Sequence, residues 1–206
     1  MFRTVLCLLA FLSLTACAGI NQDFASDAEV QAARFTAEGP SSITLFTVVS
    51  TRNGSGAHSG LLINGSERVM FDPAGSWFNR SIPEQGDVHY GMTNQAVAMY
   101  IDYHARETFR VVEQTVEVPT SVANIAIARA KAYGAVPQAQ CANSISNILS
   151  GVPGFEGLRK TWYPNKYSEQ FELLPGVKTR VINDDDADEH SALLAQQASV
   201  APLPAN

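Results

Sequence analysis

Cys141 is placed where a thiol could act as a nucleophile. It stands at the start of a helix predicted over Gln140 to Ser150, whose inward face is apolar. The first turn of a helix offers unpaired amides and the positive end of the macrodipole. Both features favour a thiolate, and an amide there could stabilise an oxyanion. The competing interpretation is a small apolar side chain that fills the core beneath the helix.

His58 is the histidine best suited to act as the general base for such a thiol. It begins an apolar strand, and its small neighbours Ser59 and Gly60 leave room above the sheet for a second reacting group. The remaining histidines are His89 in a glycine-flanked loop, His104 at a polar position of a predicted helix, and His190 in an acidic segment. A hydrogen-bonded histidine at a strand edge is the alternative reading of His58.

The opening His58-Ser59-Gly60-Leu61, followed by a hairpin and a later cysteine at a helix start, resembles the permuted papain-like proteins related to the NlpC/P60 superfamily. In those proteins the histidine precedes the cysteine, as it does here. The resemblance implies an α+β fold, with an antiparallel sheet packed against helices in a circularly permuted papain-like arrangement. It also implies a third residue after the next strand that orients the imidazole. Asp72 matches that position, and Asp87 or His89 are the substitutes.

The turn at Asn64-Gly65 gives a geometric test of this assignment, because strand side chains alternate between faces and the turn sets the register. A plain two-residue turn would place His58 opposite Phe71 and send Asp72 to the other face. A three-residue loop or a bulge would bring His58 and Asp72 onto one face. We therefore expect such an irregularity in this hairpin.

The hydrophobic pattern elsewhere predicts mixed helices and strands that would position these residues. Thr93 is the expected N-cap of the first helix, and Gly134 and Gly151 should follow the ends of the other two. The predicted strands are Ile43 to Ser50, Ala57 to Ile63, Glu67 to Phe71 and Thr108 to Val118, and the predicted helices are Asn94 to Arg106, Pro119 to Ala132 and Gln140 to Ser150.

The N-terminus has the layout of a secretory signal peptide, with Arg3 before an apolar stretch and small residues at its end. The segment Leu14-Thr15-Ala16-Cys17 resembles the lipobox of bacterial lipoproteins, which implies cleavage after residue 16 and acylation of Cys17. An ordinary signal peptide is the alternative. Ala18 implies outer-membrane sorting, again by resemblance. With Cys7 removed and Cys17 acylated, Cys141 would be the one free thiol of the mature chain.

Composition divides the rest into a tether over residues 17–40, one α+β domain over 41–183 and an acidic tail over 184–206 that we expect to be mobile. The net charge is −6, and five acidic residues are concentrated in the run from Asp184 to Glu189. The nearly neutral remainder has no basic stripe, so nucleic acid is not an expected partner. The only expected membrane contact is the lipid on Cys17.

These features together predict a lipid-anchored hydrolase or acyltransferase of the cell envelope, with Cys141 as nucleophile, His58 as base and Asp72 as orienting residue. The expected substrate is an amide bond in cell-wall peptide, with a lipid ester or lipoyl amide as the second choice. No metal or organic cofactor is expected, because His58, His89, His104 and Asp72 lack a recognisable ligand spacing. The alternative is a binding or structural lipoprotein with an unreactive Cys141.

Overall fold

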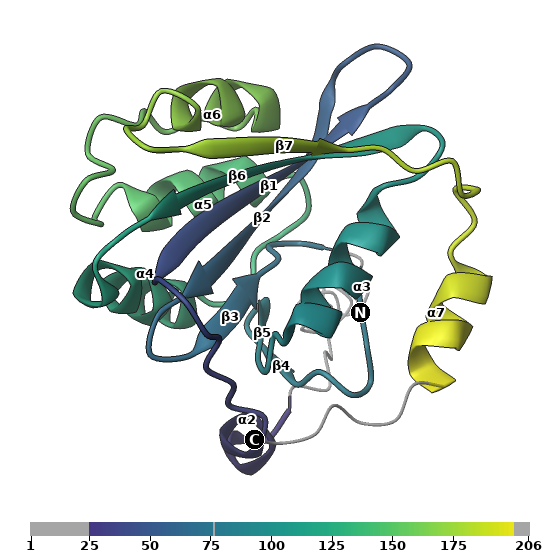
Figure 1. Cartoon of the computed structure of the whole chain (residues 1–206), viewed down its shortest axis with the longest axis horizontal. Helices are drawn as coiled ribbons and strands as arrows, with labels where there is room; N and C mark the ends of the chain where they lie inside the picture. Colours follow the sequence, from purple (N-terminus) through teal and green to yellow (C-terminus); the bar gives the residue numbers. More distant parts are fainter. Residues whose placement is uncertain (1–24, 76, 200–206) are drawn as a thin grey trace, which may run out of the picture.

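A single antiparallel sheet forms the centre of the computed structural model, which describes residues 25–75 and 77–199 (Figure 1). Its strands are β1 Ser42–Ser50, β2 Gly56–Asn64, β3 Arg68–Phe71, β4 Glu84–Gln85, β5 Val88–His89, β6 Phe109–Glu117 and β7 Lys178–Ile182. Their spatial order is β4-β5-β3-β2-β1-β6-β7. The α+β class and the antiparallel sheet agree with the expectation from the sequence.

Helices pack on both faces of this sheet (Figure 1). They are α2 Asp27–Ala32, α3 Asn94–His104, α4 Thr120–Tyr133, α5 Cys141–Leu149, α6 Pro164–Phe171 and α7 Ser191–Ser199. One hydrophobic core lies between the sheet and α4, α5 and α6, and a second lies between the sheet and α3. Among the described residues, no helix combines the length and apolarity needed to cross a membrane.

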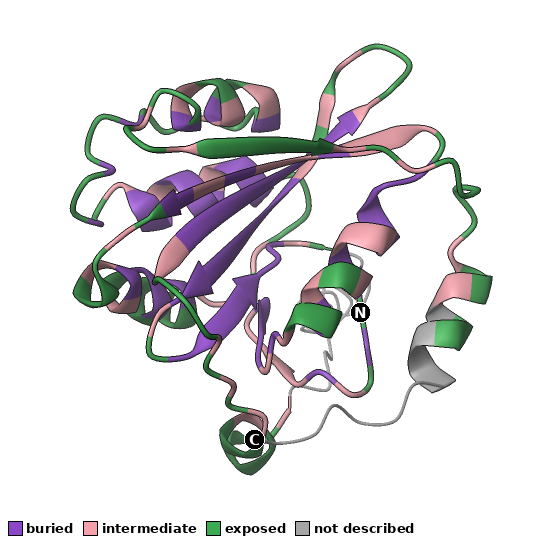
Figure 2. Ribbon diagram, in the orientation of Figure 1, coloured by how far each residue is buried: buried purple, intermediate pink, exposed green. Residues whose placement is uncertain are grey.

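The central strands are buried on both sides because each face has its own core. Ile43 and Leu45 of β1 point into the core under α4 to α6, whereas Phe46 points into the core under α3. This arrangement explains why the β1 segment reads as a nearly continuous apolar run rather than as an alternating one. Figure 2 shows the buried central strands beside the exposed edge strand β7.

The hairpin between β2 and β3 contains the irregularity that the sequence analysis requires. Asn64 pairs with Arg68, so three residues form the loop, and Leu61 pairs with Phe71. In this register Gly60 and Asp72 are opposite each other, and His58 lies on their face of the sheet. The prediction of a shared face is confirmed.

The helix that carries Cys141 is held by its apolar face and at its C-terminus. Its apolar side chains Ile145, Ile148 and Leu149 are fully buried, as predicted. At its C-terminus, Arg129 of α4 donates hydrogen bonds to the carbonyls of Ile148 (2.6 Å) and Asn147 (3.0 Å). A cation at this end complements the helix macrodipole. The apolar face and the C-terminal end of α5 are therefore both anchored to the rest of the domain.

Two histidines lie in surroundings other than those predicted. His89 is in β5 rather than in a loop, because the glycine-flanked segment pairs with β3 and β4. His104 is buried rather than on a polar face, because the end of α3 turns it toward the sheet. Its Nδ1 lies 2.9 Å from the carbonyl oxygen of Tyr100, and this pairing lowers the cost of burying the ring.

The acidic segment after β7, expected to be mobile, contacts the domain. Asp186 pairs with the buried Arg106 (3.0 Å), and Asp188 accepts hydrogen bonds from Thr108. Helix α7 follows within the same segment. At the other end of the chain, the predicted signal peptide over residues 1–16, Cys17 and Ala18 lie outside the described residues.

Candidate active site

Cys141 is the first residue of α5 and is 7% exposed. The backbone amides of Ser59 on β2 and Ala142 on α5 lower the pKa of its thiol. The amide of Cys141 itself belongs to the first turn, whose N–H groups have no acceptor within the helix. The thiol is thus surrounded by donors that favour negative charge on sulfur or on an oxygen formed beside it.

His58 lies between Cys141 and Asp72. Its Nε2 is 2.6 Å from Oδ1 of Asp72, and the same ring interacts with the Cys141 thiol, so that each group shifts the pKa of the other. Because Asp72 occupies Nε2, Nδ1 is the ring atom left for the sulfur. The structure therefore brings together the three residues that the sequence analysis selected, from β2, the end of β3 and the start of α5.

Electrostatics within this group favour a thiolate and imidazolium pair. Burial alone would lower the pKa of His58, but the charge and hydrogen bond of Asp72, together with Cys141, raise the pKa to about 10. Burial likewise opposes ionisation of Cys141, and yet His58 and the two amides lower the pKa of the thiol. The pKa of Asp72 is held well below its usual range by His58 despite burial. Ordinary values for histidine and cysteine are about 6.5 and 8.5, so the two groups are shifted toward charge at neutral pH.

Tyr100 on α3 is a further part of the site that sequence reasoning missed. Its hydroxyl donates a 2.8 Å hydrogen bond to the same Asp72 oxygen that pairs with His58. A tyrosine at a helical spacing that matches an apolar face gives no signal beyond core packing. Gly60 makes this contact possible, since a Cβ on that residue would lie 2.2 Å from the Tyr100 hydroxyl.

Asp87, which sequence reasoning kept as a substitute for Asp72, has a different position. Its carboxylate accepts hydrogen bonds from the amides of Ala74 (3.0 Å) and Val136 (2.9 Å). It therefore ties the loop after Asp72 to the loop before Cys141. Ala74, Asp87 and Ala139 are also the described non-glycine residues with positive φ, between 55° and 63°. Such conformations are costly and persist where the surrounding contacts hold them.

The two other buried histidines near Asp72 are neutral. Burial lowers the pKa of both His89 and His104 to about 4, despite the nearby Asp72 carboxylate. The His104 ring is stacked parallel to that of His58, with 5.5 Å between centroids. Trp77 packs edge-on against both His89 and Tyr100. His89 does not replace Asp72 as the partner of His58, because it forms no bond with that ring.

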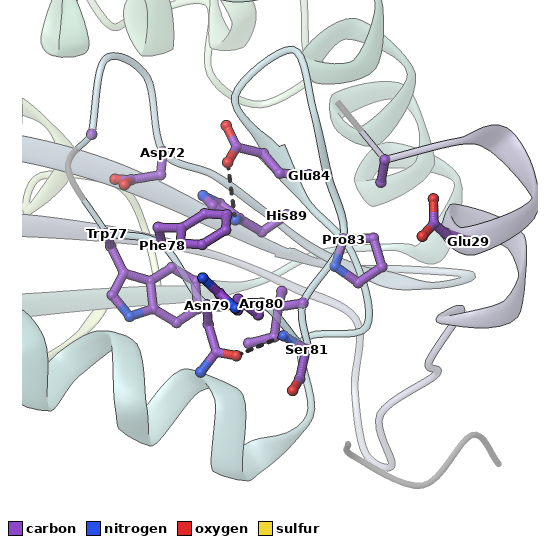
Figure 3. Close-up of a pocket in the computed structure, with 13 residues that line it drawn as sticks. Glu29, Asp72, Trp77, Phe78, Asn79, Arg80, Ser81, Pro83, Glu84 and His89 are labelled. Atoms are coloured by element: carbon purple, nitrogen blue, oxygen red, sulfur yellow. Dashed lines mark hydrogen bonds and ion pairs between the residues drawn. The ribbon is translucent and has the colours of Figure 1, made fainter. Parts of the chain in front are cut away.

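A pocket of about 470 Å³ lies beside Asp72, and its walls come from α2, from the loop after β3, and from β4 and β5 (Figure 3). Figure 3 shows Glu84 and His89 facing each other there, with 4.0 Å between Oε2 and Nδ1. Trp77 is buried in its wall, whereas Phe78 is 57% exposed. Neither His58 nor Cys141 lines it.

The arrangement can perform nucleophilic acyl transfer. It contains an activated thiol, an imidazole within reach of it, and a carboxylate that holds the imidazole. Comparisons of the chain with protein families, curated protein sequences and solved structures find no match. The chemical assignment therefore depends on the geometry of Cys141, His58 and Asp72.

Proposed function

We propose that the chain is a lipid-anchored cysteine hydrolase or acyltransferase of the cell envelope, with a circularly permuted papain-like domain related to the NlpC/P60 superfamily. The observation that carries the proposal is the juxtaposition of Cys141, His58 and Asp72, in which His58 is hydrogen-bonded to Asp72 and lowers the pKa of a cysteine at a helix N-terminus. The order of His58 before Cys141 in the chain supports the permuted arrangement.

In the proposed reaction the Cys141 thiolate attacks the carbonyl carbon of an amide or ester and forms a C–S bond. The carbonyl oxygen becomes an oxyanion, which the first-turn amide of Cys141 can meet. The tetrahedral adduct collapses, the C–N or C–O bond breaks, and the His58 imidazolium gives its proton to the leaving group. Water or another acceptor then attacks the thioester while His58 takes its proton, the C–S bond breaks, and the thiolate and imidazolium pair is restored.

The substrate class follows from the proposed location. The lipobox-like segment ending at Cys17 supports anchoring in the envelope. The cell-wall peptide is a polymer of that compartment, and its amide bonds are the proposed substrate. A lipid ester is the second substrate of the same chemistry, because an anchored enzyme faces the membrane surface. Neither chemistry requires a metal or an organic cofactor.

The test is hydrolysis by the purified full chain of two substrate sets: soluble cell-wall peptides, and a short-chain thioester or ester of a lipid analogue. We expect release of a new amine from the peptide, or of an alcohol or thiol from the ester or thioester, read by mass spectrometry. Loss of Cys141 removes the nucleophile, and losses of this kind reduce turnover by several orders of magnitude.

Cys141→Ser is the variant to compare, because it changes one atom at the reacting position. Ser144→Ala is its matched control: this neighbouring α5 hydroxyl bonds only to the Cys141 carbonyl in the described contacts. Turnover of either substrate that survives Cys141→Ser would contradict the proposal. An inert thiol in the folded chain would instead favour a binding or structural lipoprotein.

A further inference from the structure

Three metal-ligating side chains converge beside the proposed nucleophile. One ligand atom from each of His58, Asp72 and His104 lies within 4.8 Å of the other two. His58 is in β2, Asp72 follows β3, and His104 ends α3. Because they are far apart in the chain, a sequence motif does not identify them. Two imidazoles and a carboxylate are a donor set that suits Zn²⁺ and similar ions.

His104 is oriented as a metal-binding histidine should be. Its Nδ1 is hydrogen-bonded to the Tyr100 carbonyl, which fixes the proton on Nδ1 and leaves the lone pair on Nε2. Histidines that bind metals typically make such a bond with the ring nitrogen opposite the ion. The mechanism proposed above gives this neutral, buried ring no role, although it stacks on the catalytic imidazole.

Asp72 is supported in the same way. Tyr100 donates to its Oδ1, and its Oδ2 is buried with no hydrogen-bond partner among the described residues. A buried carboxylate oxygen without a partner is costly, and a cation would offset that cost. A second pocket, of about 170 Å³, is lined in part by His104 and His190, so one member of the cluster borders a surface pocket.

We propose that His58, Asp72 and His104 form a binding site for a divalent ion of the Zn²⁺ class, and that this ion reversibly inhibits the thiol chemistry of Cys141. The inhibition rests on the proposed function, whereas the binding does not. The ion replaces the proton that lies between Nε2 of His58 and the Asp72 carboxylate, and this proton is released to solvent. Ligand atoms of a tetrahedral zinc site are roughly 3.3 Å apart, so the 2.6 Å contact must open slightly.

Inhibition follows from the electronics of the ring. An imidazole with Zn²⁺ on Nε2 keeps its one proton on Nδ1, the atom that faces the thiol, and so has no lone pair there to accept another. Cys141 is outside the ligand set, because the cluster among the described residues consists of His58, Asp72 and His104 alone. The ion would therefore leave sulfur unligated while it prevents His58 from accepting a proton.

The experiment uses the untagged full chain carrying Cys7→Ser and Cys17→Ser, so that Cys141 is its single thiol. It is titrated with Co²⁺ as a spectroscopic probe, and Zn²⁺ is then added in competition. We expect one ion per chain and visible d–d bands of a nitrogen and oxygen site, without a thiolate-to-cobalt charge-transfer band. His104→Gln should weaken binding by at least about tenfold, as loss of ligand support does elsewhere.

His190→Gln is the matched control, since His190 lines the same small pocket but is outside the ligand set, and it should bind Co²⁺ like the parent chain. A charge-transfer band that disappears in Cys141→Ser would overturn the site in favour of simple capture by the thiol, and so would an absence of binding. The spectrum of the parent chain decides this even where a variant fails to fold. Alkylation of Cys141 in metal-free protein separately reports whether the proposed function holds.

Discussion

Replacement of His58 by glutamine should slow alkylation of Cys141 by iodoacetamide at pH 7 by at least about tenfold. The thiolate is the reacting form, and each unit by which the pKa of the thiol rises above 7 lowers the thiolate fraction about tenfold. The imidazolium is the charge that offsets burial of the thiolate, so its loss lets burial raise the pKa of the thiol. Glutamine can still donate to Asp72, which limits damage to the fold. The rate is measured by mass spectrometry on the peptide that contains Cys141.

The His58 variant has a matched control in His190→Gln, which removes a histidine that makes no contact with Cys141 in the described structure. We expect the control to be alkylated at the parent rate. Equal rates in the parent chain and the His58 variant would mean that the thiol is not paired with this imidazole.

Replacement of Gly60 by alanine should both destabilise the domain and reduce the reactivity of Cys141. The new Cβ would lie 2.2 Å from the Tyr100 hydroxyl and 3.5 Å from Oδ1 of Asp72. Tyr100 is fully buried and cannot swing into solvent, so either the strand or the ring must shift. Overpacking of this kind costs about 1–3 kcal/mol in the free energy of unfolding.

The Gly60 prediction is checked by denaturant unfolding together with the alkylation rate at pH 7. Gly157→Ala is the control, because a Cβ there meets no heavy atom within 4 Å. It should be neutral or slightly stabilising. A Gly60→Ala chain with parent stability and parent reactivity would show that Tyr100 does not hold Asp72 against His58.

Much of the site could be predicted because its chemistry follows local rules. A cysteine at a helix start and a histidine at a strand start can be recognised in the sequence. Because strand side chains alternate between faces, the hairpin at Asn64-Gly65 needed a three-residue loop or a bulge to place Asp72 on the face of His58. The three-residue loop that meets this condition is a turn detail that Asn-Gly alone does not predict.

Tyr100, His104 and Asp87 required tertiary information. Tyr100 and His104 reach Asp72 only because α3 packs on the face of the sheet opposite α5. Asp87 joins two loops, and 49 residues separate it from Val136 in one of them, so no local pattern encodes this contact.

The missed elements have weak local signals for physical reasons. Strand β7 is an exposed edge whose Lys-Thr-Arg-Val-Ile sequence lacks a buried face, which is how edge strands avoid pairing with other chains. Strands β4 and β5 have two residues each and depend on their neighbours. Helix α6 was predictable in part, since Pro164 occupies its first turn, where proline is favoured.

The most direct test of a paired nucleophile is the pH dependence of Cys141 alkylation in the folded full chain, compared with the same chain in denaturant. Thiolate forms as the pH rises through the pKa of the thiol, and the structure lowers that pKa, so the folded curve should lie at lower pH than the denatured one. The denatured midpoint should be about 8.5. A folded chain in which Cys141 reacts only after denaturant is added would contradict the account, because it would mean that the thiol is a buried and inert part of the core.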